Sequence, residues 1–315
     1  MNQKCQKCVH YVADLFNNTI DKKEIEMKAI ISADWHLRSD RPRCRLDEDW
    51  MTTQIVQMKH IARIVDDTDT ILCIVGDLFD RAIVSERIKT AFLKFVNLLP
   101  ESVYIIAGNH CLPYHSWSNE ENSSFGVIWA SGKVKHLNEL GKSAHFGEEL
   151  SGKDNDILFI HRLVFETAKD LPPNVNASTA EQLLEEFPDA KWIFTGDNHH
   201  HFHYEKDGRH VINPGCINRQ SADMISYQPI VYHVDTDANF VEEIALIDDV
   251  KMITDEYLRT EEARETRISA FVESVRSSEN VSLDFLGNLN MAIKENPDIE
   301  KSVIRTITEI VEENK

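Results

Sequence analysis

The sequence predicts an α/β protein, and three observations lead to this prediction. Short apolar runs alternate with segments of helical periodicity, as in sheets whose two faces are both covered. Polar motifs rich in Asp, Asn and His follow directly after most of these runs. Near residue 253 the strand-like runs end and charged helical segments begin. With 315 residues, the chain is long enough for one large domain and a smaller helical module.

The first convincing strand begins at Met27, in the run MKAIISA, and we read residues 1–26 as an N-terminal appendage. Because the following runs are apolar at successive positions, each strand should be buried on both faces. The further strands are expected at 71–75, 103–107, 157–160 and 192–195. Helices are expected between them, at 49–65, 84–98 and 179–187.

The second half of the domain is richer in antiparallel pairing. A hairpin is predicted from His203 to Ile212, because Asp207-Gly208 is a strong two-residue turn signal. Two more strand-like runs, 229–234 and 240–247, flank a polar turn. We therefore expect a domain at 27–250 and a helical tail, a possible partner-docking module, at 251–315. Its helices are expected at 255–277, 282–295 and 298–313.

Composition and charge limit the class of function. No run approaches the roughly 18 apolar residues of a membrane span, and residues 1–16 lack the apolar core of a signal peptide. The six cysteines are scattered, which fits a cytoplasmic protein without disulfides or membrane contact. A net charge of −19 argues against a broad basic surface for nucleic acid, although metals and local basic patches can still support DNA binding.

The polar motifs contain ligands suited to a transition metal. Asp34 and His36 are two residues apart after the first strand, and Asp197 and His199 repeat this spacing after the run 192–195. In an extended segment such side chains point the same way, so each pair can reach one metal.

Three further motifs follow strands. Asp77 has two carboxylate oxygens that can bridge two cations, although alone it reads as a turn or helix-capping residue. Asn109 offers a neutral oxygen, and the next residue, His110, can face a substrate. His161 alone would more often be structural. Together these residues lie at strand ends, where α/β sheets bind ligands, and their mixed oxygen and imidazole donors suit Mn, Fe or Zn.

The chain resembles the calcineurin-like metallophosphoesterase superfamily in these motifs, taken in order: Asp34-Trp35-His36, Gly76-Asp77-Leu78-Phe79-Asp80, Gly108-Asn109-His110, His161 and Gly196-Asp197-Asn198-His199. Two stretches, 41–50 and 213–220, are similar to those of SbcD-type DNA repair exonucleases, especially phage-borne ones. The resemblance covers roughly residues 27–247.

The resemblance implies a four-layer αββα metallophosphoesterase sandwich with two divalent metal ions, usually manganese. The implied ligands of the first metal are Asp34, His36 and His199. Asp77 would bridge the metals, and the second metal would be held by Asn109, His161 and Asp197. His110 would be the catalytic histidine facing the substrate.

Two positions depart from the family pattern. Asp197 stands where the family commonly has the first His of a Gly-His-x-His motif, and Asp80 stands where SbcD-like proteins often have His. The extra carboxylate makes the second site less positive, so we expect Mn or Mg there rather than Zn. Because Asp80 replaces that His, the sequence does not predict how a DNA end would be positioned.

The function predicted from the residues and the resemblance is a two-metal phosphodiesterase, namely a DNA exonuclease in repair or recombination. Two cations lower the pKa of a bridging water so that hydroxide can attack phosphorus. His110 would stabilise phosphoryl charge and protonate the leaving oxygen. Candidate contacts with DNA phosphates are Arg43, Arg45 and Arg219. An equally weighted alternative pairs the arginines of the loop at 38–45 with nearby acids such as Asp47.

The resemblance also implies partners. An SbcC-type ATPase would bind the C-terminal helices, and a homodimer is possible because the nuclease core of that family is often dimeric. The apolar positions of these helices could equally cover the core of their own domain. Two other functions stay open: a phosphoesterase that acts on nucleotides, cyclic nucleotides or phosphoproteins, and a metal-binding scaffold that recruits the ATPase without cutting.

Overall fold

The computed structural model describes residues 27–101, 103–146, 150, 156–247, 252–256, 258, 266–269, 285–296 and 299–313. The chain divides into two units, Met1–Thr254 and Asp255–Lys315. The predicted appendage at 1–26 lies outside the described residues, as does most of the helix predicted at 255–277. Of the helices that are described, none combines the length and the apolar character needed to cross a membrane.

The described residues of the first unit form a six-stranded mixed sheet in the order β13-β12-β1-β2-β3-β4. Neighbouring strands are parallel from β1 to β4 and antiparallel from β1 to β13. The carboxyl ends of β1, β2 and β3 therefore meet at one edge. The bounds are β1 (Lys28–Ser32), β2 (Ile71–Val75), β3 (Val103–Ile106), β4 (Val134–His136), β12 (Ile230–Asp235) and β13 (Phe240–Ala245).

A second sheet has the order β10-β11-β9-β6-β5. Its strands are parallel except for β10, which forms the predicted hairpin with β11. The bounds are β5 (Lys142–Ala144), β6 (Ile157–Ile160), β9 (Trp192–Thr195), β10 (Phe202–Lys206) and β11 (Arg209–Asn213). A small pairing joins β7 (Val164–Phe165) to β8 (Ser178–Thr179).

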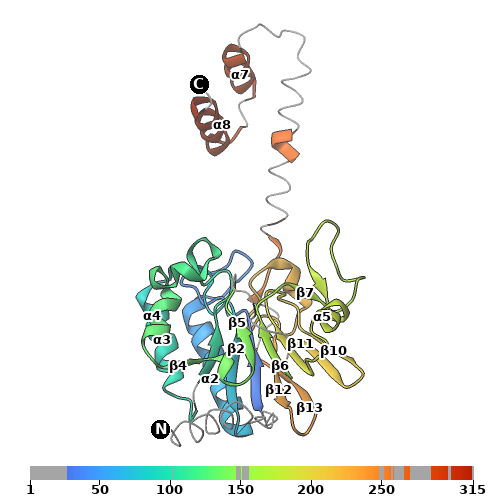
Figure 1. Ribbon diagram of the computed structural model, residues 1–315. Coiled ribbons are helices and arrows are strands. Elements are labelled where there is room, and N and C mark those ends of the chain that lie inside the picture. The colour runs from blue at the N-terminus through green and yellow to red at the C-terminus, as the bar shows by residue number, and fades with distance from the viewer. Residues whose placement is uncertain are drawn as a thin grey trace, which may run out of the picture. The chain divides into compact units, whose positions relative to one another are not determined.

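Helices α2 (Trp50–Thr68), α3 (Glu86–Val96) and α4 (Ser124–Ala130) lie on one side of the sheets, and α5 (Ala180–Glu186) lies on the other (Figure 1). Side-chain caps fix three helix starts. The Asp49 carboxylate accepts from the Thr52 N–H before α2, the Ser123 hydroxyl accepts from the Gly126 N–H before α4, and Thr179 and Gln182 form a capping box at α5. Short 3₁₀ turns are found at η1 (Pro113–His115), η2 (Trp117–Asn122), η3 (Leu137–Glu139) and η4 (Ala222–Ser226).

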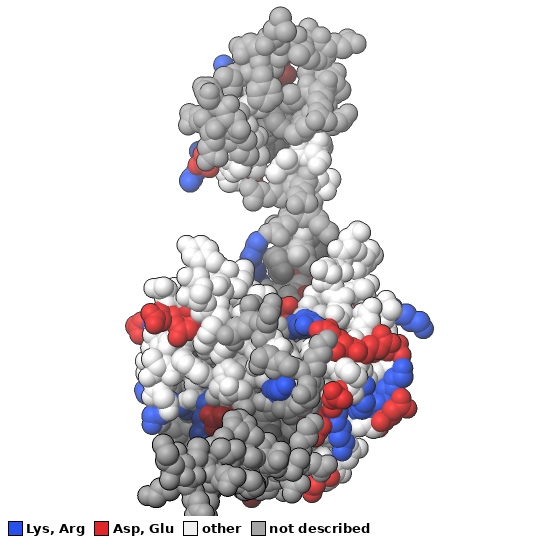
Figure 2. All heavy atoms as spheres, in the orientation of Figure 1, with Lys and Arg blue, Asp and Glu red and all other residues white. Residues whose placement is uncertain are grey.

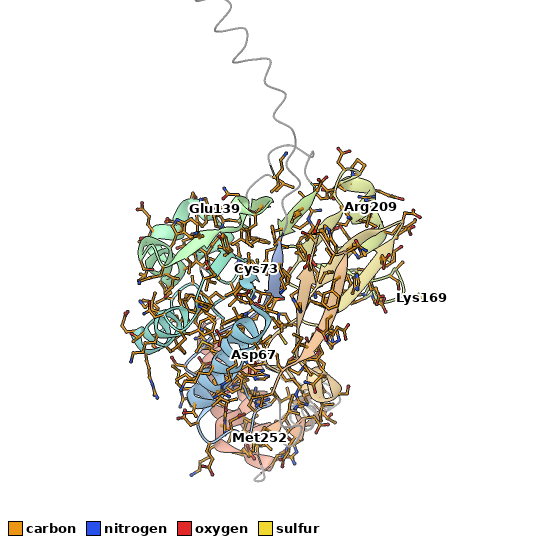
Figure 3. All side chains as sticks on the ribbon, turned by 90° about the horizontal axis from the view of Figure 1, so that it is seen from below. Asp67, Cys73, Glu139, Lys169, Arg209 and Met252 are labelled. Carbon is orange, nitrogen blue, oxygen red and sulfur yellow. The ribbon has the colours of Figure 1, made fainter. Side chains whose placement is uncertain are left out.

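The described residues pack into three hydrophobic cores, one between each pair of adjacent layers. In β1, Ile30 packs in the core formed with α2 and α3, while Ala29 and Ile31 face the second sheet. In β6, Phe159 lies between the sheets and Leu158 packs in the core formed with α5. Figure 3 shows Cys73, which belongs to the core between the sheets, in the middle of the domain. The predicted four-layer αββα sandwich is thus confirmed.

Besides the short 3₁₀ turns, five described elements were not predicted, namely β4, β5, β7, β8 and α4. The strands have two or three residues each and α4 has seven, which is too short for periodicity to be visible. The second unit contains α7 (Phe285–Glu295) and α8 (Lys301–Glu313), within the segments where helices are predicted. In α8 an ion pair of 2.8 Å joins Arg305 Nε to Glu309 Oε1 one turn later.

We predict that Phe159→Ala lowers the free energy of unfolding by about 3–5 kcal/mol, because it leaves a cavity in the core between the sheets. The ring of Phe159 is fully buried and stacks on Phe194 with centroids 5.1 Å apart. Urea denaturation of the metal-free protein measures the change. Phe240→Ala on β13, where the side chain is 41% exposed, is the control and should cost about 1 kcal/mol or less. Equal losses of unfolding free energy in the two variants would contradict the packing of Phe159 in the core between the sheets.

Candidate metal centre

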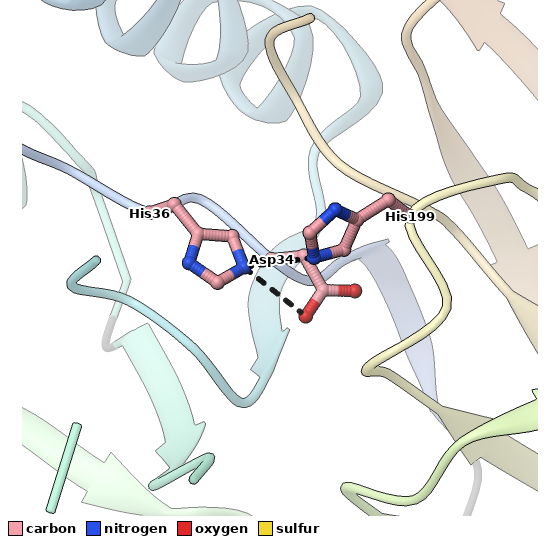
Figure 4. A group of neighbouring side chains, drawn as sticks. All are labelled: Asp34, His36 and His199. Carbon is pink, nitrogen blue, oxygen red and sulfur yellow. Dashed lines mark hydrogen bonds and ion pairs between the residues drawn. The ribbon is translucent and has the colours of Figure 1, made fainter. Parts of the chain in front are cut away.

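Side chains from two strand ends, one in each sheet, converge on one buried spot. Asp34, His36 and His199 point toward one another (Figure 4), with 3.1 Å between the two Nε2 atoms and 4.0 Å from His36 Nε2 to Asp34 Oδ1. Asp34 and His36 are buried and His199 is half-buried. Two imidazole nitrogens and a carboxylate oxygen facing one point form a donor set suited to a divalent transition metal.

Asp77 connects this group to a second one. Its Oδ1 accepts a hydrogen bond of 2.9 Å from the His110 N–H. Its Oδ2 is buried, and among the described residues no donor is aligned to hydrogen-bond with it. This oxygen lies 3.3 Å from His161 Nε2 and 3.7 Å from His36 Nε2. An unsatisfied buried carboxylate oxygen is costly, and a bridging position between two cations would satisfy it. The residues therefore fit a dinuclear centre.

His161 presents one defined nitrogen to the centre. Its Nδ1–H donates to the Val75 carbonyl at 2.9 Å, which leaves Nε2 to face Asp77 and, at 3.1 Å, Asn109 Oδ1. A backbone acceptor on the outer nitrogen is the usual way in which a metal-binding histidine is oriented.

Asp197 contacts the centre through its backbone. Its N–H lies 3.1 Å from each carboxylate oxygen of Asp34. Among the described residues, its side chain is in none of the groups of ligand atoms that lie within 4.8 Å of one another. A ligand role for Asp197 therefore stays a prediction.

The backbone that carries these residues is not extended, and the assumption of extended backbone was wrong. Asp34, His36, Asp77 and Asp197 have φ of 49°, 42°, 42° and 74°. Side chains two residues apart converge because the chain turns through the left-handed region. Such conformations cost about 1–3 kcal/mol each. Backbone bonds between the two strand ends hold them, from Asp34 N–H to Gly76 O and from His36 N–H to Asp77 O.

The glycines before two of the motifs make room for His161. A Cβ at Gly76 would lie 2.0 Å from His161 Nδ1, and φ there is +91°. A Cβ at Gly196 would lie 2.5 Å from the same nitrogen. The spacing of these motifs thus reflects the packing of backbone around a buried imidazole.

Three supporting residues were missed at the sequence level. Buried Asn213 donates from Nδ2 to the carbonyls of Asn198 and His200, at 2.6 and 2.8 Å, and so fixes the loop before β10. Gln220 Nε2 lies 3.3 Å from the His36 carbonyl. His115 Nδ1–H donates to the Asn109 carbonyl at 2.9 Å. Only the resemblance of 213–220 pointed to the first two, and no signal pointed to His115.

Electrostatics in the metal-free centre follow from burial and close charges. Burial raises the pKa of Asp34 and lowers the pKa of His36 to about 3. Burial also opposes charge on His161, but the carboxylates, Asp77 foremost, outweigh it and raise the pKa of His161 to about 10. Asp77 is buried too, yet the charge of His161 holds its pKa below the ordinary value. Without metal, a proton therefore sits on His161 beside an ionised Asp77.

The predicted phosphate-binding arginines differ in exposure. Arg45 is only 3% exposed, and its guanidinium binds both carboxylate oxygens of Asp47, at 2.7 and 2.9 Å. Arg219 is also buried and donates to the Ile225 carbonyl at 2.7 Å. These positions favour the alternative in which such arginines bind the protein itself. Arg43 is exposed.

Asp80, the second departure from the family pattern, is bound by arginines. Its carboxylate lies 2.8 Å from Arg38 Nη1 and 3.2 Å from Arg81 Nη2. Its backbone carbonyl accepts from His110 Nδ1–H at 2.9 Å. Asp80 thus anchors the loop that orients His110.

Comparison with known proteins gives one family match and several similar solved structures. Residues 27–226 match the family described as calcineurin-like phosphoesterase. An archaeal phosphodiesterase structure is 16% identical, with 70% of this chain and all of that one covered at a TM-score of 0.39. Vacuolar protein sorting 29 from Cryptosporidium parvum is 14% identical, with 72% of this chain and all of that one covered at a TM-score of 0.34. Among curated protein sequences, none matches significantly.

Gly76→Ala should abolish metal binding at the dinuclear centre, because the new Cβ displaces His161. Gly132→Ala is the matched control: φ there is +66°, but no atom lies within 4 Å of the new Cβ. It should cost only the left-handed strain of about 1–2 kcal/mol. Elemental analysis measures the metal content of each variant, and urea denaturation measures its free energy of unfolding. Normal metal content in Gly76→Ala would show that His161 is not needed for the centre.

Metal binding should release at least one proton at pH 7. His161 is protonated in the metal-free centre below its raised pKa of about 10, and a metal ion can bind only the neutral imidazole. Apparent affinity should therefore rise with pH up to that value, by about tenfold per pH unit for each proton displaced. Calorimetry in two buffers of different ionisation enthalpy counts the protons. Binding without proton release would contradict this charge state.

Proposed function

The chain belongs to the calcineurin-like phosphoesterase family, and on this premise we propose that it is a DNA exonuclease of the SbcD type, acting in repair or recombination. Metal-dependent phosphoester hydrolysis is the activity of the family, and the family binds two metal ions. The proposal of DNA as the substrate rests on the stretches 41–50 and 213–220. The proposal of catalysis rather than a non-cutting metal-binding scaffold rests on the position of His110.

His110 is an exposed imidazole at the mouth of a buried centre. Its ligand-type atoms lie within 4.8 Å of those of His36 and Asp77, and its ring meets that of His36 edge-on with centroids 4.9 Å apart. Because Nδ1–H is bound to the Asp80 carbonyl, Nε2 is the nitrogen left for a substrate. A scaffold that only holds metal would have no use for such a group.

The reaction is in-line displacement at phosphorus. When bound, the two metal ions supply the nucleophile by lowering the pKa of water, and they neutralise phosphoryl charge. One ion would be held by Asp34, His36 and His199. The other would be held by Asn109, His161 and Asp197. Asp77 would contribute to both sites. His110 Nε2 donates a hydrogen bond to a phosphoryl oxygen and then a proton to the leaving oxygen. The Asp80 carbonyl holds the imidazolium in place through Nδ1.

DNA would be bound locally rather than over a broad surface. With a net charge of −19, the protein cannot rely on a long row of phosphate contacts. On the face drawn in Figure 2, the basic side chains of the described residues lie singly or beside acidic ones. The metal ions would then supply most of the attraction for phosphate, with exposed Arg43 as the candidate contact outside the centre.

Manganese is the proposed metal. Three carboxylates, those of Asp34, Asp77 and Asp197, offset much of the +4 charge of two divalent ions. A donor set so rich in oxygen favours Mn over Zn.

The proposed partners are an SbcC-type ATPase, bound by the helical tail, and a second copy of this chain. A groove of about 500 Å³ between α2 and α3 supports the homodimer, because it is lined by Met51, Met58, Phe95 and Leu98 among others. A cytoplasmic location is proposed because Cys44, Cys73 and Cys111, in the described part of the chain, are buried and form no disulfide.

The test is digestion of end-labelled double- and single-stranded DNA in Mn²⁺ and in Zn²⁺. The purified full-length protein should degrade DNA faster in Mn²⁺, and His110→Ala should reduce the rate by at least about a hundredfold. His60→Ala on α2, a histidine in none of the ligand groups of the described residues, should leave the rate unchanged.

Small esters separate the remaining possibilities. Cleavage of bis(p-nitrophenyl) phosphate without cleavage of DNA would replace the proposal with a phosphodiesterase for smaller substrates. If the protein binds Mn²⁺ but cleaves nothing even after an SbcC-type ATPase is added, the remaining function is the non-cutting metal-binding scaffold. Full activity in His110→Ala would remove the proposed proton donor.

A further inference from the structure

A second cluster of metal-binding side chains lies on the β10–β11 hairpin. It consists of His203, Glu205 and His210, and each offers a ligand atom within 4.8 Å of the other two. We propose that this hairpin cluster is a separate zinc site, formed by two imidazoles and a carboxylate on one face of the hairpin.

The register of the hairpin creates the cluster. Glu205 pairs directly with His210, and His203 pairs with Ile212. Side chains two residues apart on a strand share a face, and directly paired residues share it as well. All three side chains therefore project from one face. His203 Nε2 and His210 Nδ1 are 3.0 Å apart, close to the separation of about 3.3 Å that two nitrogens have when each lies about 2.0–2.1 Å from one tetrahedral zinc ion.

Asn239 selects the tautomer that a metal needs. Its Oδ1 lies 3.2 Å from His210 Nε2, so this nitrogen carries the proton and donates it. Nδ1 of the same ring is then unprotonated and directs its lone pair toward His203 and Glu205. In zinc sites, the ring nitrogen of a coordinating histidine that does not bind the metal usually donates its N–H to such an acceptor. Asn239 belongs to the turn between β12 and β13, and so the site would connect two hairpins.

Packing holds the cluster in place. The His210 ring is 2% exposed and stacks on Trp192 with centroids 4.0 Å apart. His203 is half-buried, with its ring 6.3 Å from that of Tyr232. Burial lowers the pKa of both histidines, which keeps them neutral and able to coordinate. Glu205 is exposed and can close onto an ion.

The cluster is distinct from the dinuclear centre. None of its three residues belongs to the groups of ligand atoms around Asp34 and Asp77 among the described residues. His203 lies beside His210, a residue that the sequence did not single out. Two imidazoles and one carboxylate form a donor set typical of zinc, with a fourth position left for water.

Zinc content of the full-length protein tests the proposal. After dialysis against buffered zinc, His203→Gln and Glu205→Gln should each carry one zinc ion fewer per chain than the unchanged protein. His233→Gln is the matched control, because His233 and Glu242 form a cross-strand pair, 3.6 Å apart, on the neighbouring hairpin. It should leave the zinc content unchanged.

Asn239→Ala gives an independent measurement. It keeps all three ligands but removes the tautomer-fixing acceptor, so zinc affinity at this site should fall about 10–100-fold. DNA cleavage should be unaffected in His203→Gln, which separates this site from the catalytic centre. Equal zinc content in His203→Gln, Glu205→Gln and the unchanged protein would overturn the proposal, as would equal losses in His233→Gln.

Discussion

The buried carboxylate of Asp77 is the group on which the rest of the centre depends. One of its oxygens is fixed by the His110 N–H, and the other faces His36 and His161 without an aligned donor among the described residues. A desolvated charge in this position is tolerated only if positive charge compensates it. In the metal-free protein the proton on His161 does so, and in the loaded protein the metal ions would. Imidazoles therefore have to surround Asp77, and three strand ends have to deliver them.

That requirement explains the local backbone. A strand that simply continued would carry its side chains past the centre, whereas left-handed residues at Asp34, His36 and Asp77 turn them inward. The fold tolerates this backbone strain because β1, β2 and β9 are packed on both faces by apolar cores. Glycine at positions 76 and 196 then follows from the space that the His161 ring occupies. The left-handed turns and the glycines of the motifs thus follow from one electrostatic constraint.

Much of this was predictable from the sequence, for identifiable reasons. Asp34, Asp77 and His161 follow buried apolar runs, and strand ends gather at one edge in an α/β sheet. The turn conformation was not predictable, because the order of residue types does not reveal φ. For Arg45 the sequence left two roles open, a phosphate contact or pairing with an acid such as Asp47, because residue order does not reveal burial. In the structure Asp47 binds its buried guanidinium. The sequence could not identify His210 as a candidate ligand, because its partners, His203 and Asn239, come together only through strand register and the packing of two hairpins.

The two histidine clusters differ in charge, and this difference bears on how one chain would keep two metals apart. The dinuclear centre lies beside three carboxylates, those of Asp34, Asp77 and Asp197, whereas the hairpin cluster has one, that of Glu205. Zinc binds nitrogen-rich sites of low charge well, while manganese gains most of its affinity from carboxylate oxygen. A zinc ion captured by the hairpin cluster would therefore not compete with manganese for the same donors.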